Sequence, residues 1–254
     1  MKTILDLIID LIHGYGRRGE VRDLVPGPVD RVPRLIHLIY GLWSRTGRLP
    51  WHCRSVLGAW RRHHPGWTVV LWGRQQGERL VKESFPELWP TYQQLARPAQ
   101  RCDLLRYLIL KRFGGVYADL DLHCRTSVEP WLPSGAALVT LVERHLTAAR
   151  AAAIGLPEPI RQGRAETLVR IANFFLAASP SHPLLTEIVE MVQSRAHLEV
   201  RRDYDVLFTT GPDVISEVVA RARPRPDLIV IDREQGLLHV THLQRGTWRQ
   251  DKHA

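Results

Sequence analysis

The sequence is poor in cysteine, and it has no long uninterrupted apolar segment. Its 254 residues include only three cysteines, Cys53, Cys102 and Cys124, which are too few and too scattered for a disulfide framework or a CxxC metal knuckle. A reducing compartment, the cytoplasm, is the simpler expectation. The sequence contains no internal repeat, heptad array or low-complexity tail, so nothing in it indicates a repeat protein or a coiled coil.

The N-terminal segment 1–18 is not convincing as a signal peptide or a membrane span. Asp6 and Asp10 interrupt its apolar run, which is short and lacks a small-residue cleavage site. The apolar residues recur at helical spacing instead, so residues 1–30 are predicted to form a helix and a linker. This helix either packs on the protein or leans on a membrane, with Arg17 and Arg18 at its end.

Acidic residues are scarce relative to basic ones. The 26 aspartates and glutamates face 35 lysines and arginines, which gives a net charge of +9. Such a balance favours an anionic partner: a nucleotide or phosphorylated substrate, an anionic membrane surface, or nucleic acid. The arginines are dispersed and no nucleic-acid recognition motif accompanies them, so we expect no nucleic acid among the partners.

Residues 31–254 are predicted to form one α/β domain with a mostly parallel sheet flanked by helices. Short apolar runs at 34–40 and 67–73 read as strands, residues 49–66 have helical spacing, and 98–115 forms the clearest helix, with the segment VYADLDL after it as the next strand. Alternating strands and helices favour a parallel sheet, whose ligands bind at the carboxyl ends of its strands.

The second half is less regular. Residues 136–142 are predicted to form a strand, and 143–168 a mobile insertion or lid. Helices are expected from Pro183 and from Pro212, where proline stands at the first helical position. The segments DLIVID and GLLHVTHL are predicted as two closing strands.

Two carboxylates stand two positions apart in the stretch FGGVYADLDLHC. If the strand continues through Asp119 and Asp121, both side chains project from one face, where like charges repel each other. The pair either lies solvated at a strand end or holds a cation such as Mg²⁺ or Mn²⁺, which accept oxygen ligands and bind diphosphates.

Asp103 and Arg106 stand three positions apart in the helix before this pair, and therefore on one helix face. They form either a local ion pair on a solvated surface or part of a site. The C-terminal segment HVTHLQRGTW adds His242 as a further candidate metal ligand and Trp248 as a flat surface or NH donor, although a lone histidine is more often structural.

Several blocks resemble glycosyltransferase family 32 in their order along the chain. They are VPRLIHLIYG (32–41), RCDLLRYLILKRFGGVYADLD (101–121), IANFFLAASPSHPLL (171–185), TTGP (209–212) and HLQRGTW (242–248). This family of DXD-containing sugar transferases includes fungal Golgi α-mannosyltransferases and bacterial capsular-polysaccharide enzymes. The resemblance implies a GT-A fold and an Mn²⁺- or Mg²⁺-dependent transferase that uses a UDP- or GDP-sugar and retains the anomeric configuration.

The resemblance also implies residue roles. The first DXD carboxylate, Asp119, would act on ribose and metal, and Asp121 would bind the metal directly. His242 matches a histidine near the metal and diphosphate, Trp248 matches a tryptophan that contacts the leaving group, and Asp103 with Arg106 would grip the donor sugar.

Four further positions match substrate-binding motifs of the family. His37 and Tyr40 lie in the first block, where Tyr40 replaces the usual tryptophan and keeps an aromatic ring for the base. Tyr117 lies in the DXD block. Asn173 lies in the second-half motif and is expected to shape the acceptor side.

The expected partners are a nucleotide-sugar donor and a hydroxyl acceptor that is a glycan or lipid-linked, with peripheral contact to the inner membrane face. A metal-dependent phosphatase or nucleotidyltransferase would need more carboxylates near the pair, where the sequence has His123 and Cys124. A non-catalytic nucleotide- or glycan-binding protein could lose the charged residues that this chain keeps.

Overall fold

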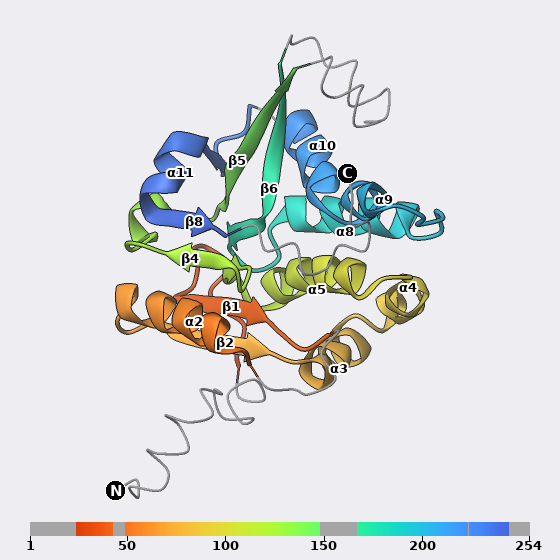
Figure 1. Ribbon diagram of the computed structural model, residues 1–254, viewed down its shortest axis with the longest axis horizontal. Helices are drawn as coiled ribbons and strands as arrows, with labels where there is room; N and C mark the ends of the chain where they lie inside the picture. The colour runs from red at the N-terminus through yellow and green to blue at the C-terminus, as the bar shows by residue number, and fades with distance from the viewer. Residues whose placement is uncertain (1–23, 43–48, 148–166, 223, 244–254) are drawn as a thin grey trace, which may run out of the picture.

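The computed structural model describes residues 24–42, 49–147, 167–222 and 224–243 (Figure 1). The predicted N-terminal helix at 1–18 lies outside the described residues. Most of the predicted lid at 143–168 also lies outside them, since only residues 143–147 and 167–168 of it are described. Among the helices that the structure describes, none combines the length and apolar character needed to cross a bilayer.

A six-stranded sheet forms the centre of the fold. Its strands, in spatial order, are β2 (Thr68–Trp72), β1 (Leu35–Ile39), β3 (Gly115–Ala118), β6 (Thr167–Ala178), β5 (Leu138–Thr147) and β7 (Leu228–Ile231). The pairs β1–β2, β1–β3 and β5–β7 are parallel, whereas β3–β6 and β5–β6 are antiparallel. The sheet is therefore mostly parallel, as the sequence predicts.

Helices cover both faces of this sheet. They are α2 (Trp51–His63), α3 (Arg74–Ser84), α4 (Trp89–Gln94), α5 (Pro98–Phe113), α8 (Pro183–Arg195), α9 (Asp203–Thr209), α10 (Pro212–Ala222) and α11 (Arg233–His239), with short 3₁₀ turns at Pro86–Leu88 and Glu129–Trp131. One core lies between the sheet and helices α3, α4, α5, α8 and α10, and a second lies between the sheet, α2 and β4.

The two cores follow from the alternation of β1. Ile36 and Leu38 point into the core shared with α2, and Ile39 points into the core shared with α5. Both faces of the strand are buried, which is why its sequence is almost continuously apolar.

The prediction of one strand through the DXD segment was wrong. The strand stops at Ala118, and after a turn the chain starts β4 (Leu122–Cys124), which pairs with β8 (Val240–His242) in a separate two-stranded sheet. The segment GLLHVTHL is likewise not one strand: its first half is the end of α11 and only its second half is β8.

The prediction of an irregular insertion from residue 143 was also wrong at its start. Strand β5 continues to Thr147 and pairs with β6, which begins at Thr167. The two strands therefore form a long antiparallel hairpin that rises above the rest of the sheet (Figure 1).

Candidate donor and metal site

Two glycines follow the last residue of helix α5 and allow the chain to turn into strand β3. Gly114 and Gly115 have φ angles of +67° and +97°, a region that side chains with a Cβ rarely adopt. A Cβ on Gly115 would also lie 2.6 Å from the carbonyl oxygen of Leu35. The backbone of β3 can approach β1 this closely because residue 115 is a glycine.

Asp119 and Asp121 share a turn at the carboxyl end of β3. The Asp119 N–H donates to the carbonyl of Phe174 (2.9 Å), and the Asp119 carbonyl accepts from the N–H of Leu122 (2.9 Å). The two carboxylates are brought together by this turn, and strand alternation is not the cause. Both side chains are partly exposed, at 26% and 22%.

His242 reaches the pair through the small sheet. Leu122 of β4 is opposite His242 of β8, and the Leu243 N–H donates to the Asp121 carbonyl (2.8 Å). The Nε2 atom of His242 lies 3.1 Å from Oδ1 of Asp121, and its ring stacks on Phe174 with 4.3 Å between centroids. The structure thus joins the DXD turn and the predicted C-terminal histidine.

Arg106 connects the helix to this turn. Its Nη1 donates to Oδ1 of Asp119 (3.0 Å) and to the carbonyl of Asn173 (2.7 Å), while Nη2 lies 2.8 Å from Oδ1 of Asp103. The guanidinium also stacks over the ring of Tyr117 at 4.6 Å. Arg106 and Asp103 are only 6% and 9% exposed, so their pair is not a solvated surface feature.

Asp103 is held from three directions. Thr210 donates from Oγ1 to Oδ2 (2.9 Å), and the Asn173 amide donates to Oδ1 (3.0 Å), the oxygen that also faces Arg106. Burial raises the pKa of Asp103 to about 6, although Arg106 and these hydrogen bonds oppose the shift.

Burial alone would lower the pKa of His242, but the hydrogen bond to Asp121 and the charges of Asp121, Asp119 and Glu143 outweigh it and raise the pKa. Burial also raises the pKa of Asp119, with Arg106 opposing the rise and Asp121 adding to it. The carboxylate pair therefore repels negative charge and attracts positive charge at this turn.

Three of these residues fit a divalent metal. One ligand atom each of Asp119, Asp121 and His242 lie within 4.8 Å of one another. Oδ1 of Asp119 already accepts from Arg106 and from the Tyr117 hydroxyl (2.5 Å), which leaves Oδ2 to face a ligand. Two carboxylates and an imidazole suit Mn²⁺ or Mg²⁺, and both carboxylates are partly exposed, so a ligand from solvent can reach them.

His37 and Tyr117 are placed differently from a direct substrate contact. The His37 ring is fully buried, its Nδ1 accepts from Trp72 (3.1 Å), and its Nε2 donates to the Gly114 carbonyl (2.9 Å). Burial lowers its pKa to about 4, which keeps the ring neutral. Tyr117 is 1% exposed and directs its hydroxyl to Asp119. In this geometry His37 positions the backbone at Gly114, and Tyr117 positions the carboxylate of Asp119.

Tyr40 follows the carboxyl end of β1 and is half-buried, whereas Trp248 lies outside the described residues.

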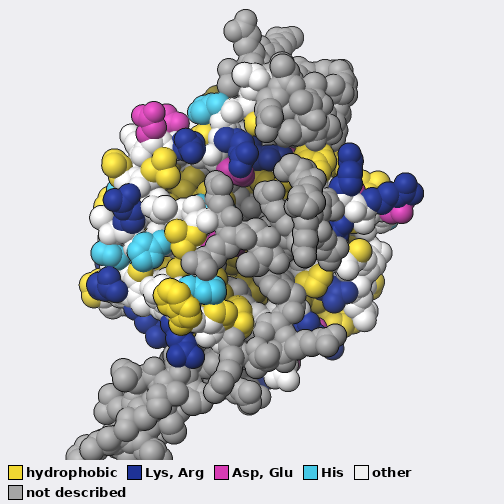
Figure 2. Space-filling model, viewed as in Figure 1, with side chains coloured by type: hydrophobic (Ala, Val, Ile, Leu, Met, Phe, Trp, Pro, Cys, Tyr) yellow, Lys and Arg dark blue, Asp and Glu magenta, His cyan; other side chains and the backbone are white. Residues whose placement is uncertain are grey.

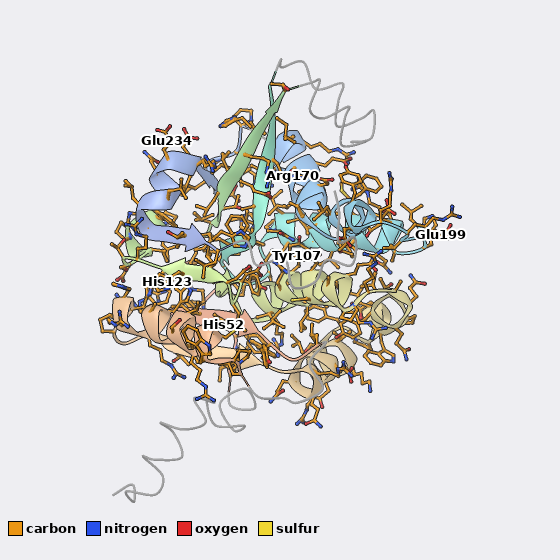
Figure 3. All side chains as sticks on the ribbon, in the orientation of Figure 1. His52, Tyr107, His123, Arg170, Glu199 and Glu234 are labelled. Atoms are coloured by element: carbon orange, nitrogen blue, oxygen red, sulfur yellow. The ribbon has the colours of Figure 1, made fainter. Side chains whose placement is uncertain are left out.

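The sequence analysis gave no site role to Thr210 or Phe174. Thr210 lies in the TTGP segment just before helix α10, and Phe174 directly follows Asn173. Both residues therefore stand inside sequence blocks that resemble the family. In Figure 3 Tyr107 lies on α5 near the middle of the molecule, and its hydroxyl donates to the Thr210 carbonyl (3.1 Å).

Comparison with known proteins matches residues 50–137 to the family described as "Glycosyltransferase sugar-binding region containing DXD motif". Inositol phosphoceramide mannosyltransferase 1 of Schizosaccharomyces pombe is 25% identical over 194 residues, which are 75% of this chain and 52% of the relative. Mannosyl phosphorylinositol ceramide synthase SUR1 of Saccharomyces cerevisiae is 32% identical over 43% of this chain and 28% of its own length. The chain thus spans about half or less of the curated relatives it matches.

Among solved structures, the PaToxG glycosyltransferase superposes with a TM-score of 0.52 at 18% identity, covering 78% of this chain and 72% of that one. At this identity the likeness concerns the fold alone.

Proposed function

We propose that this chain, which belongs to the glycosyltransferases with a DXD-containing sugar-binding region and has their GT-A fold, transfers a hexose from a nucleoside diphosphate sugar to a hydroxyl acceptor. The observation that supports this most is the convergence of Asp119, Asp121 and His242 on one point at the carboxyl edge of the sheet. Mannose is the first hexose to test, because several of the curated relatives are named mannosyltransferases.

The reaction breaks the bond between the anomeric carbon and the diphosphate and forms a bond from that carbon to the acceptor oxygen. The acceptor proton passes to the departing diphosphate, on the same face of the sugar, which retains the anomeric configuration. The carboxylates hydrogen-bonded in this network of described residues are Asp119, Asp121 and Asp103, and Glu143 adds its charge near His242. Each of the three hydrogen-bonded carboxylates is already engaged by a neighbouring side chain, which supports a reaction without an enzyme nucleophile.

The chain's own residues would bind and orient the donor. Asp121 and His242 would hold a divalent ion, and Asp119 would accept from the ribose and share the ion through the oxygen that Arg106 leaves free. A bound Mn²⁺ or Mg²⁺ would neutralise charge on the leaving diphosphate. Tyr40 would stack on the base, since it follows β1 at the same sheet edge.

Arg106 would act mainly by fixing other groups. Both of its terminal nitrogens are engaged with Asp119, Asn173 and Asp103, so it sets the position of a carboxylate and of the backbone of β6. The grip of Asp103 and Arg106 on the donor sugar, the contact of Trp248 with the leaving group and the acceptor role of Asn173 remain predictions from the resemblance. Holding these groups in place would raise the rate of transfer, since groups that are already oriented lose less entropy when the transition state forms.

The test is a donor panel. Purified protein with Mn²⁺ is incubated with UDP- and GDP-hexoses, GDP-mannose included, and release of the free nucleoside diphosphate is followed by mass spectrometry. We expect one donor to be consumed, and Asp121→Ala to consume none while melting at nearly the wild-type temperature. Binding of a nucleotide sugar without consumption of any donor, with or without added hydroxyl acceptors, would instead identify a binding protein.

A further inference from the structure

We propose that the outer face of helix α2 binds the surface of an anionic phospholipid bilayer. This face, called the α2 face below, consists of Trp51, Arg54, Arg61 and Arg62, all of them exposed. It belongs to the described α/β domain and is separate from the N-terminal segment 1–18.

The amphipathic pattern of α2 separates two chemically distinct sides. Its inner side packs into the core through buried residues (Cys53, Val56, Leu57, Ala59 and Trp60). Its outer side carries three arginines at helical spacing, and the whole helix, WHCRSVLGAWRRH, contains no aspartate or glutamate. An amphipathic helix with a basic face and an interfacial tryptophan is typical of membrane-surface contacts.

The positive charge of the α2 face has no acidic partner within the described part of the chain. Among the described residues, no carboxylate forms an ion pair with Arg54, Arg61 or Arg62. Glu129, whose charge acts on His64 at the C-terminal end of α2, is paired with Arg34 at 2.7 Å. The α2 face therefore offers free charge to an external anion.

Figure 2 shows this distribution on the molecular surface. Over α2 the visible side chains are dark blue, cyan and yellow, and none is magenta. Yellow side chains also lie over α11 on the same face of the molecule, beside dark blue and magenta ones, and Leu238 of α11 is 69% exposed. Positive charge and apolar surface thus occur together here.

Trp51 favours a bilayer over a soluble polyanion. Its side chain is 79% exposed, the largest exposed fraction among the large apolar residues described. Arginines alone suffice to bind a polyanion, whereas a tryptophan ring in water gains free energy when it enters the headgroup region of a bilayer. Trp51 stands at the first turn of α2, one turn before Arg54, where it can insert while the arginines contact phosphates.

Docking through this face would keep the candidate site next to the bilayer. Helix α2 is the first described helix after the carboxyl end of β1, and β3, parallel to β1, ends at Ala118, directly before Asp119, on the same edge. The binding itself does not depend on the proposed transferase activity, so the two can fail separately.

The test uses the full chain and sedimentation with vesicles of phosphatidylcholine alone or of phosphatidylcholine mixed with the anionic lipid phosphatidylglycerol, whose negative surface charge attracts basic segments. We expect binding to the anionic vesicles only, and Arg61→Gln/Arg62→Gln should weaken it about thirtyfold. The matched control, Arg201→Gln/Arg202→Gln, removes the same charge from another exposed arginine pair and should leave binding unchanged. Trp51→Phe should remove the quenching of protein fluorescence by brominated lipid.

Equal weakening in both arginine pairs would overturn the proposal, because it would reduce the effect to net charge. Loss of binding on deletion of residues 1–18, with no effect of Arg61→Gln/Arg62→Gln, would assign the contact to the N-terminal segment. Retention on heparin that depends on Arg61 and Arg62, without vesicle binding, would identify a soluble polyanion as the ligand. Donor consumption in detergent-free solution, measured in parallel, reports the transferase activity independently.

Discussion

The Nε2 atom of His242 lies 3.1 Å from Oδ1 of Asp121, although 121 positions separate the two residues. The pairing of β4 with β8 makes this contact possible, because it sets Leu122 opposite His242. The DXD turn therefore has a third candidate ligand that its own sequence neighbourhood does not contain.

A divalent metal ion should stabilise the folded protein by binding to Asp121 and His242. A ligand that binds only the folded state raises the free energy of unfolding with its concentration, so Mn²⁺ should raise the melting temperature of the wild type. Asp121→Asn and His242→Ala should each abolish most of the shift in differential scanning fluorimetry. Asp30→Asn removes a carboxylate charge from a residue that is 76% exposed and should keep the shift. A full shift in Asp121→Asn would exclude Asp121 as a metal ligand.

Tyr117→Phe should lower kcat/KM about tenfold. The change deletes the hydroxyl that donates to Oδ1 of Asp119, and a hydrogen bond to a charged group contributes about 1.5–3 kcal/mol. Arg106 would still hold the carboxylate, so some activity remains.

Tyr92→Phe is the matched control for this variant. Tyr92 is also buried, but within the described structure its hydroxyl has no hydrogen-bond partner. Steady-state kinetics of the two variants should differ, and equal activities would show that the Tyr117 hydroxyl does not position Asp119.

His37 should make the protein less stable in acid. Burial lowers its pKa from the ordinary 6.5 to about 4, so the unfolded chain takes up a proton between these values that the folded chain does not. The contribution of His37 is complete above pH 6.5 and is lost as the pH falls toward 4, by about 3 kcal/mol.

The His37→Gln variant isolates this effect. Urea unfolding of the wild type and the variant at several pH values should give stability curves whose difference shrinks as the pH falls from 6.5 to 4. The raised pKa of Asp103 acts in the opposite direction, lowering stability as the pH rises toward 6, but it is common to both proteins and cancels in the difference. A difference that is constant across this range would mean that His37 titrates normally in the fold.

Two glycine substitutions should have opposite signs. Gly115→Ala should lower the free energy of unfolding by about 2–3 kcal/mol, because φ is +97° there and the new Cβ meets the Leu35 carbonyl. Gly58→Ala, inside α2 and with open space around the new Cβ, should raise it by about 0.5–1 kcal/mol. Chemical denaturation measures both, and a neutral Gly115→Ala would indicate that β3 can move away from β1.

The sequence predicted the first half of the fold well because its signals there are local. The apolar run of β1, the helical spacing of α2 and the proline and glycines that bound α5 each act within a few residues. The GT-A fold expected from the resemblance is confirmed by the comparisons, and the family model with the DXD motif matches residues 50–137.

The errors arose where long-range pairing decides the structure. The alternating sequence VYADLDL continues the strand pattern, yet β4 leaves the main sheet because its partner is β8, over a hundred residues later. In GLLHVTHL the apolar residues suit a strand, but Asp232 caps a helix start by accepting from the Arg233 N–H, and the leucines belong to that helix.

The site shows the same division. Asp103, Arg106, Asp119 and Asp121 were predicted from one continuous block, whereas the support of Asp103 by Thr210 depends on contact between α5 and the residue that follows α9. The buried roles of His37 and Tyr117 could not be inferred either, because a motif gives no information on which side chains reach the surface.

The pairing of β4 with β8 has a consequence for synthesis of the protein. Chains fold as they emerge from the ribosome, N-terminal parts first, and the strands β1, β2, β3, β5 and β6 are complete well before β8 is made. Until then the turn with Asp119 and Asp121 lacks its histidine. A nascent chain would thus have five strands of its central sheet while the candidate metal site is still incomplete, and that site would form only once β8 is made.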